Sequence, residues 1–270
     1  MKIKHYVIVN FMSWQPVGWD REVGDPLLEQ QRLATLEKYL LPSLERQTSR
    51  DFTLILYIGK QLSITARDYL RSIKTTFPVI IGESGAMATE LKTAWAENDC
   101  VITSKMADDD MPWIGAAAEV RRIADQGLPF VIHGYRRGIV YVEGEGIMNW
   151  RYPNDYGQLA IFMSLIRTTE AEPMSINDLG KHNEVRTNAE RDYKKFGLKE
   201  LPAGWWNSDD TTDPAWCYVR HKNAVFGDRD QARHKWRNLD PDLSPLKEHF
   251  GFELVGKQIN EENKYEWQKC

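Results

Sequence analysis

The first 127 residues alternate between two hydrophobic patterns, and this alternation constrains the fold more than any other feature of the sequence. Short runs rich in β-branched and aromatic residues predict strands, whereas apolar residues three and four positions apart predict helices. The predicted strands cover 5–11, 52–59, 79–84 and 100–106, and the predicted helices cover 27–47, 63–77, 87–98 and 112–127. Such a repeat predicts an α/β fold with a mostly parallel central sheet flanked by helices.

Two prolines mark expected features of these helices. Pro42 lies inside the predicted helix 27–47, where it removes a backbone N–H group and should kink or split the helix. Pro112 opens the predicted helix 112–127, and proline is favoured in the first helical turn. We therefore expect an interrupted first helix and a fourth helix that begins at Pro112.

The sequence changes character after residue 128. The segment 129–150 predicts two strands joined as a hairpin by "RRG", and 215–221 predicts a last strand. Residues 158–168 fit either a strand or a short helix, and a helical stretch lies near 184–196. We expect one domain made of an α/β half over 1–127, a half rich in hairpins and loops over 128–240, and a peripheral tail over 241–270.

The composition restricts the cellular setting and the partners. The three cysteines lie far apart in the sequence, which argues against a disulfide framework and for a reducing, cytoplasmic setting. No stretch approaches the roughly 20 apolar residues of a transmembrane helix, so none is expected. The formal net charge of −4 argues against nucleic acid as a partner, because proteins that bind nucleic acid usually carry a basic excess.

Three consecutive aspartates, Asp108, Asp109 and Asp110, follow the predicted strand 100–106. Ligands of open α/β sheets bind beyond the carboxyl ends of the strands. A carboxylate cluster there favours a hard divalent cation, Mg²⁺ or Mn²⁺, which could act as a Lewis acid on a leaving phosphate. The alternative is an acidic turn that caps the helix predicted from Pro112, which is worth about 0.3–1 kcal/mol per acid.

Three segments carry a resemblance to a known family. They are "RLATLEKYLLPSLERQTSRDFTLILYIG", "SKMADDDMP" and "DPAWCYVRHKNAVFG", in this order along the chain. Together they resemble a bacterial family described as rhamnosyltransferases, which look like glycosyltransferases of GT-A type. The resemblance implies a GT-A-like domain with an acidic D-x-D motif, a divalent metal (Mn²⁺ or Mg²⁺) and a nucleotide-sugar donor.

This resemblance implies a hexosyltransferase that moves a sugar from the donor to an acceptor hydroxyl, on a carbohydrate or another molecule. Residues 1–127 would bind the nucleotide sugar, and 128–240 would form the acceptor side. The donor-binding residues would be Arg32, Lys105, Asp108 and Asp109. The metal ligands would come from Asp108, Asp109, Asp110 and His221, where His221 could instead touch the diphosphate.

One position departs from the family pattern. Ala107 stands where the acidic run of the family usually begins, while Asp109 and Asp110 match its closing pair. Asp108 falls on the variable position between them and could replace the missing carboxylate by a shift of one residue. The departure leaves the metal dependence and the ligand set open.

An inverting transfer also needs a carboxylate that takes the proton of the acceptor hydroxyl. The candidates are Asp178 in "SINDLGKH" and Asp209 and Asp210 in "WWNSDDTTD", all in predicted loops. Trp205 and Trp206 lie beside the second group and could stack on the acceptor, because indole rings present flat apolar faces.

Two other function classes fit parts of the pattern. A metal-dependent phosphohydrolase or nuclease also gathers acids at strand ends, although its ligands usually come from several strands. A nucleotide-sugar-binding protein whose catalytic machinery has decayed would explain the departure at Ala107.

Overall fold

The computed structural model describes residues 1–13, 24–151, 161–170, 172–181, 184–210, 212, 214–221 and 239–252. Within these residues a seven-stranded sheet has the order β10-β6-β9-β4-β1-β2-β3. The strands are β1 Ile3–Phe11, β2 Thr53–Ile58, β3 Val79–Gly82, β4 Cys100–Met106, β6 Phe130–Tyr135, β9 Met163–Thr168 and β10 Trp206–Asp209. Strand β9 is antiparallel to β4 and β6, and all other neighbours in this sheet are parallel. The predicted mostly parallel sheet is confirmed.

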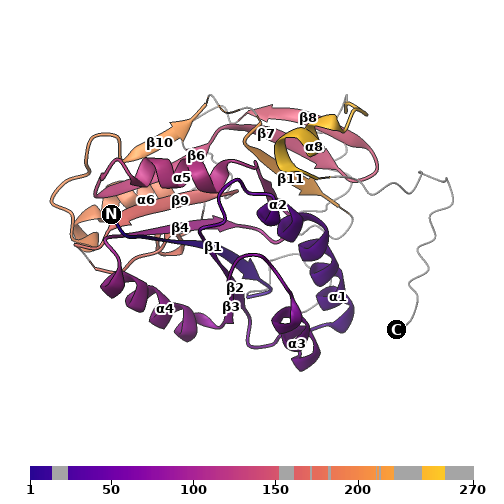
Figure 1. The fold of residues 1–270 in the computed structure, drawn as a ribbon, viewed down its shortest axis with the longest axis horizontal. Helices are drawn as coiled ribbons and strands as arrows, with labels where there is room; N and C mark the ends of the chain where they lie inside the picture. Colours follow the sequence, from indigo (N-terminus) through magenta and orange to yellow (C-terminus); the bar gives the residue numbers. More distant parts are fainter. Residues whose placement is uncertain are drawn as a thin grey trace.

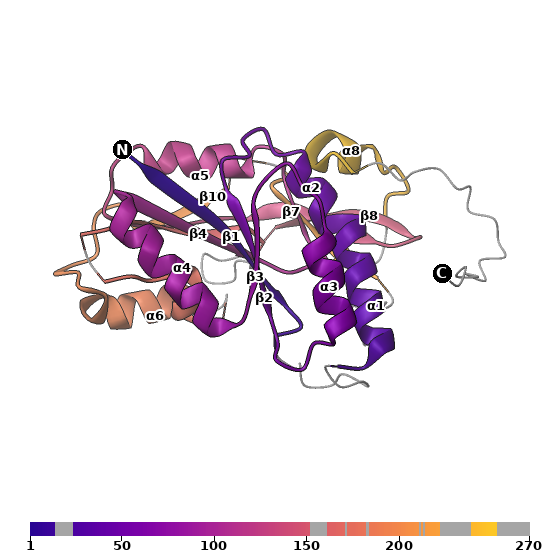
Figure 2. The ribbon, with the colours of Figure 1, turned by 60° about the horizontal axis from the view of Figure 1, so that its bottom comes forward.

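Helices cover both faces of this sheet, as predicted (Figures 1 and 2). In Figure 2, α5 lies above the strands, whereas α4 and α6 lie below them. Apolar side chains of α5 share one core cluster with β1, β4 and β9, and those of α4 and α6 pack against the opposite face. The helical elements in this region are α3 Ile64–Ser72, α4 Ser84–Glu97, α5 Ala116–Ala124, η2 Ile176–Leu179, α6 Val185–Asp192 and η3 Tyr193–Phe196.

The first helix is interrupted, as Pro42 predicted. It consists of α1 Pro26–Thr35, a π-helical segment η1 Leu36–Leu40 and α2 Leu41–Glu45. The N–H of Leu41 bonds to the carbonyl of Leu36, five residues back. Since a proline ring clashes with the carbonyl four residues before it, a wider turn directly ahead of Pro42 lets the helix continue.

The prediction that a helix begins at Pro112 is wrong. Met111–Pro112 form the short strand β5, which pairs antiparallel with β11 Trp216–Arg220, and α5 begins only at Ala116. Proline is tolerated in an edge strand because it needs no ladder hydrogen bond there. The three aspartates are therefore outside the first turn of α5. The interpretation of the acidic triplet as a helix cap is wrong, because the helix does not begin at Pro112.

The hairpin predicted within 129–150 is also wrong in its pairing. Strand β6 belongs to the large sheet, whereas β7 Arg137–Val142 belongs to a second, four-stranded sheet with the order β5-β11-β7-β8 among the described residues. The true hairpin joins β7 to β8 Gly146–Arg151. The chain thus changes sheets at Arg136, and hydrophobic patterning alone cannot tell a change of sheet from a tight turn.

Other predicted elements agree with the structure to different extents: α3 ends at Ser72 rather than at residue 77, and Asp209, predicted in a loop, lies in strand β10. Strand β9 resolves the ambiguity over 158–168, and β11 and α6 match the last predicted strand and the helical stretch. The described part of the expected peripheral tail forms α8 Ser244–Phe250, whose Leu246 and Phe250 are buried against the small sheet. Among the described residues, no helix is long and apolar enough to cross a membrane.

The lack of a side chain at Gly138 allows β7 to pack closely against β11. A substitution at this position tests how much that close packing contributes to stability. A Cβ atom there would overlap the ring and the carbonyl oxygen of Trp216, which is 1% exposed. We expect Gly138→Ala to lower the free energy of unfolding by about 1–3 kcal/mol, as overpacking does. Gly85→Ala is the matched control, because no atom lies within 4 Å of its added Cβ in helix α4. Urea unfolding of both variants checks this, and equal midpoints would contradict it.

Candidate functional site

The three aspartates lie beyond the carboxyl end of β4, at the edge where β1 also ends. Their exposed fractions are only 3% for Asp108, 7% for Asp109 and 4% for Asp110. Three adjacent carboxylates this deeply buried need positive partners or protons, since an isolated buried charge is very costly.

Arg32 of α1 neutralises part of this charge. Its Nε donates to Asp108 Oδ2 at 2.9 Å, and its Nη2 pairs with the other oxygen of Asp108. Its Nη1 donates to Asp109 Oδ2 at 3.2 Å. The structure therefore brings together residues that are 76 and 77 positions apart in the sequence. Both oxygens of Asp108 are engaged by this fork, so Asp108 is held as a structural counter-ion of Arg32.

His221 lies at the end of β11 and contacts the same cluster. Its Nε2 is 3.1 Å from Asp109 Oδ2, so Asp109 lies between His221 and Arg32. The ring of Tyr39 stacks on the imidazole, with a centroid distance of 6.2 Å and an interplanar angle of 26°. The hydroxyl of Tyr39 donates to Glu143 at 2.9 Å. Tyr39 belongs to the π-helical segment, and such segments are frequent at functional sites.

Tyr39 and Glu143 are residues that sequence reasoning missed. Tyr39 reads as one more apolar position of an amphipathic helix, and Glu143 lies inside the second strand predicted within 129–150. The proline three residues after Tyr39 is a weak signal that this helix is irregular.

Asp109 and Asp110 have opposite electrostatic environments. Burial alone would raise the pKa of Asp109, but the charge of Arg32 and the hydrogen bond to His221 outweigh it and lower the pKa to about 2. Burial, and then the charge of Asp109, raises the pKa of Asp110 well above its usual value. Oδ1 of Asp110 is buried and has no hydrogen-bond partner. Asp110 is thus the member of the triplet that keeps an unsatisfied carboxylate oxygen.

A divalent metal can be held by a full set of protein ligands or by a partial set completed by water and substrate oxygens. No three Asp, Glu, His or Cys side chains in the described part of the chain gather so that they could hold a metal ion. The residues therefore do not form an all-protein cage. They do fit an ion that takes one or two carboxylates and fills its other positions with water and phosphate oxygens, as Mg²⁺ commonly does. The unsatisfied Oδ1 of Asp110 is the oxygen that supports this fit.

Lys105 and Asp178 lie near the same loop, outside the aspartate cluster. Lys105 is 7% exposed, and its ammonium donates to the carbonyl of Gly180 at 2.8 Å. Burial lowers the pKa of Lys105 to about 8. Asp178 accepts hydrogen bonds from the backbone N–H and the hydroxyl of Ser175, which closes the capping box of η2. The observed bonds of Asp178 are therefore local and structural.

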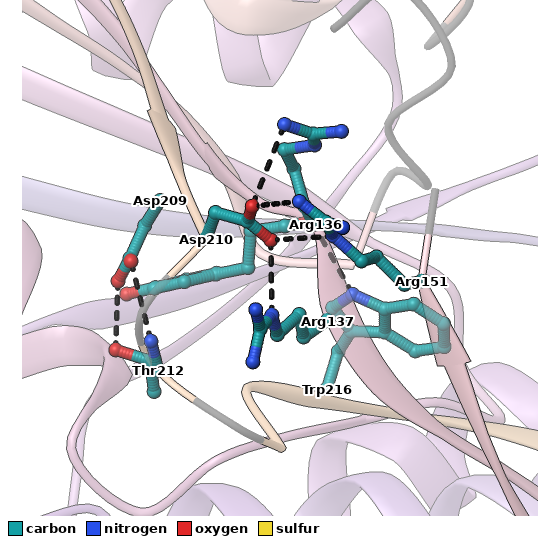
Figure 3. Close-up of polar contacts among 8 residues, drawn as sticks. Arg136, Arg137, Arg151, Asp209, Asp210, Thr212 and Trp216 are labelled. Carbon is teal, nitrogen blue, oxygen red and sulfur yellow. Dashed lines mark hydrogen bonds and ion pairs between the residues drawn. The ribbon is translucent and has the colours of Figure 1, made fainter. Parts of the chain in front are cut away.

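Asp209 and Asp210 face different partners at the end of β10 (Figure 3). Asp209 accepts from the backbone N–H and the hydroxyl of Thr212, at 3.2 and 2.7 Å. Asp210 instead receives the guanidinium groups of Arg136, Arg137 and Arg151. The hydrogen bond from Arg151 contributes most to lowering the pKa of Asp210 to about 2. A carboxylate that gives up its proton so readily is a weak proton acceptor for a hydroxyl group.

Trp205 and Trp206 are half-buried on the outer side of β6. Trp205 lies 6.4 Å from Phe130 and 5.7 Å from Trp206, measured between ring centroids. The guanidinium of Arg186 lies 5.4 Å from the ring of Trp206. Both indoles therefore pack within the protein, and their stacking on an acceptor stays a prediction.

A cleft of ≈ 500 Å³ lies away from these residues, between α2 and α3. Its lining includes Glu37, Pro42, Tyr69 and Lys74, and no predicted site residue contributes to it. The cleft therefore gives no support to the candidate site.

The sequence matches the model of a protein family described as "Putative rhamnosyl transferase" over residues 25–177, which is more than half of the chain. The chain belongs to this family. Membership identifies the chain as a glycosyltransferase, as the three sequence segments implied. The matched segment contains Arg32 and the three aspartates, whereas Asp210 and His221 lie beyond it. No curated protein matches the sequence.

Solved structures that are similar to this one are distant in sequence. A "putative nucleotide-diphospho-sugar transferase" from Desulfovibrio desulfuricans G20 shares 9% identity at a TM-score of 0.39, with 93% of this chain and 92% of that chain covered. TarS 1–349 from S. aureus, in complex with UDP-GlcNAc, shares 10% identity at a TM-score of 0.41, with 82% and 59% covered. At these TM-scores the likeness carries no argument about this chain.

Proposed function

We propose that this protein transfers a sugar from a nucleotide-sugar donor to an acceptor hydroxyl, and that the donor diphosphate binds at the three aspartates. The family membership supports the reaction class. The observation that carries the location is the buried carboxylate of Asp110 beyond the end of β4, whose Oδ1 has no hydrogen-bond partner. That edge of an open α/β sheet is where ligands bind.

The residues of the cluster would have different roles in donor binding. Arg32 holds Asp108 and Asp109 in place and offsets their charge, and His221 contacts the same oxygen of Asp109 as Arg32 does. Asp110, with Asp109, would hold a divalent ion that arrives with the donor. Such an ion supplies Lewis-acid stabilisation of the negative charge on the leaving diphosphate.

In the transfer, the acceptor oxygen forms a bond to the anomeric carbon of the sugar, and the bond from that carbon to the diphosphate breaks. If the reaction inverts, a carboxylate takes the proton of the acceptor hydroxyl. Of the three candidates, Asp210 is the weakest base because it is bound to three arginines. Asp178 and Asp209 remain the proposed bases, and each accepts a hydrogen bond from the hydroxyl of an uncharged residue, Ser175 and Thr212 respectively.

A thermal-shift screen tests this proposal with UDP, GDP, dTDP and their sugars, each with and without Mn²⁺. A ligand at 100 times its dissociation constant stabilises the native state by about 2.7 kcal/mol, so the correct nucleotide should stand out. We expect the shift to require Mn²⁺ and to be lost in Asp110→Asn. The proposal is wrong if no nucleotide shifts the transition and no donor sugar is transferred or released.

The same screen separates the rival functions. A decayed nucleotide-sugar-binding protein would give the shift without turnover on any acceptor. A phosphohydrolase would release inorganic phosphate from the nucleotide without sugar transfer. The lack of three converging metal ligands among the described residues speaks against a two-metal hydrolase.

A further inference from the structure

We propose that Tyr39 is a positioning residue of the donor site, whose ring holds the imidazole of His221 against Asp109. The importance of Asp109 for the donor rests on the proposed function, but the positioning of His221 can be tested without donor or metal. Tyr39 lies in η1, and His221 directly follows the end of β11. The contact therefore joins the first helical run of the chain to the last strand of the small sheet.

The ring of Tyr39 is packed among other rings and is only 1% exposed. Its centroid lies 6.2 Å from that of the His221 imidazole. Aromatic pairs that stack with an offset have centroid distances of about 4.5–7 Å. The rings of Phe252 and Tyr141 lie 5.4 and 6.5 Å from that of Tyr39. Because a ring held this way cannot turn aside without opening a cavity, it gives the imidazole a rigid surface.

Glu143, which follows the end of β7, connects the two sides of this contact. Its Oε1 accepts a hydrogen bond from the hydroxyl of Tyr39 at 2.9 Å and also pairs with the ammonium of Lys38. Its backbone N–H donates to the carbonyl of Arg220 at 2.9 Å, and Arg220 directly precedes His221. The side chain of Glu143 thus holds η1, and its backbone holds the end of β11. Both partners of the stacked pair are fixed relative to one another.

The orientation of His221 affects Asp109 directly. Nε2 of His221 and Nη1 of Arg32 lie 3.1 and 3.2 Å from the same oxygen, Oδ2 of Asp109. The described residues make no hydrogen bond to its Oδ1. The two contacts therefore fix the carboxylate through one oxygen and leave the other for an ion or a ligand. An imidazole that turned away would leave Oδ2 with Arg32 alone, and the carboxylate could rotate.

One helical run supplies both supports of Asp109. Arg32 of α1 contacts the carboxylate directly, and Tyr39 of η1 contacts it through His221. Outer residues of this kind orient the groups that bind a metal, and their loss commonly weakens metal binding. The alternative is that Tyr39 only fills the apolar cluster of the small sheet, to which Phe250 also belongs. The two roles predict a different behaviour of His221 when the ring of Tyr39 is removed.

NMR correlation of the imidazole nitrogens with the ring protons tests the positioning in the protein without donor or metal, at about pH 8, where free histidine is neutral. We expect the native protein to show one tautomer of His221, with the proton on Nε2 towards Asp109. In Tyr39→Leu the imidazole is no longer held, so both tautomers should appear. Tyr39→Phe keeps the stacked ring and loses only the bond to Glu143, so the Nε2–H tautomer should be retained.

Two further variants make this test decisive. Phe250→Leu opens a similar cavity in the same apolar cluster and should leave the tautomer of His221 unchanged. Tyr39→Met replaces Tyr39→Leu if that variant does not fold, because methionine fills irregular gaps in a core but cannot stack as a ring does. The proposal is refuted if the variant without the ring keeps the single tautomer, or if Phe250→Leu loses it as well.

Titration of Mn²⁺ in the presence of the nucleotide found by the thermal-shift screen gives a second readout. Tyr39→Leu should raise the half-saturating Mn²⁺ concentration on the order of tenfold, as the loss of an outer residue of a metal site commonly does. Phe250→Leu should leave that concentration unchanged, and an equal rise in both variants would refute the positioning role. Since the NMR test uses no nucleotide, a failed screen would overturn the proposed function and leave the result on His221 standing.

Discussion

Replacement of Arg32 by methionine lowers the free energy of unfolding by about 3–5 kcal/mol, which is the cost of stranding a buried charge. Methionine occupies a similar volume, so the loss comes from the carboxylates that Arg32 leaves behind. Asp108 would lose both of its guanidinium contacts, and Asp109 would keep only His221. Domains have stabilities of about 5–15 kcal/mol, so this variant should be close to unfolding at 37 °C.

Urea unfolding at pH 7 measures this loss, with Arg71→Met as the control. Arg71 pairs with Asp68 on the surface of α3 at 62% exposure, and its loss should cost less than about 1 kcal/mol. An equal effect of the two variants would show that the Arg32 fork adds nothing beyond a surface ion pair.

The Arg32 variant should also change the pH dependence of stability. In the native protein the pKa of Asp109 is about 2, below its unfolded value of about 3.9. This difference contributes stability that is present above pH 4 and is lost as the pH falls through about 2. Without Arg32, burial would favour the protonated acid instead. The difference in the free energy of unfolding between the native protein and the variant should therefore be largest at neutral pH and should shrink below pH 4.

Replacement of Asp110 by asparagine should separate activity from stability. The pKa of Asp110 is raised in the folded protein, so its ionised form costs stability at neutral pH, and a neutral amide removes that cost. We expect the free energy of unfolding to stay the same or to rise by about 1 kcal/mol. Metal-dependent sugar transfer should fall on the order of 100-fold or more, since the charge that would hold the metal is lost.

Asp109→Asn is the matched control for this prediction. It differs by one position, but it removes the charge that binds both Arg32 and His221, so stability should fall by about 1.5–3 kcal/mol. Unfolding midpoints and transfer rates of the two variants give the comparison. A loss of stability in Asp110→Asn as large as that in Asp109→Asn would mean that Asp110 is a structural acid, and unchanged transfer would remove it from the site.

Much of the architecture could be predicted because hydrophobic periodicity is a local property. The strand 100–106 and the split of the first helix at Pro42 follow from residues within a few positions of one another. Two errors of pairing, at Pro112 and within 129–150, share a different cause. Whether Met111–Pro112 starts a helix or pairs with Trp216–Cys217 depends on a strand more than 100 residues away. Whether β6 turns back on itself or passes to a second sheet depends on β11 as well.

The sequence by itself determined the α/β class, the place of the acidic triplet after a strand, and the family. Only the tertiary structure decided which positively charged residue pairs with which aspartate. Arg32 meets Asp108 across 76 residues, His221 meets Asp109 across 112, and Arg151 meets Asp210 across 59. Three neighbouring aspartates look equivalent in the sequence, because the sequence does not show which distant residue each carboxylate contacts. In the folded protein Asp108 is a counter-ion, Asp109 bridges Arg32 and His221, and Asp110 keeps an unsatisfied oxygen. Because all three are buried, the charge state of each depends on the distant residues that contact it.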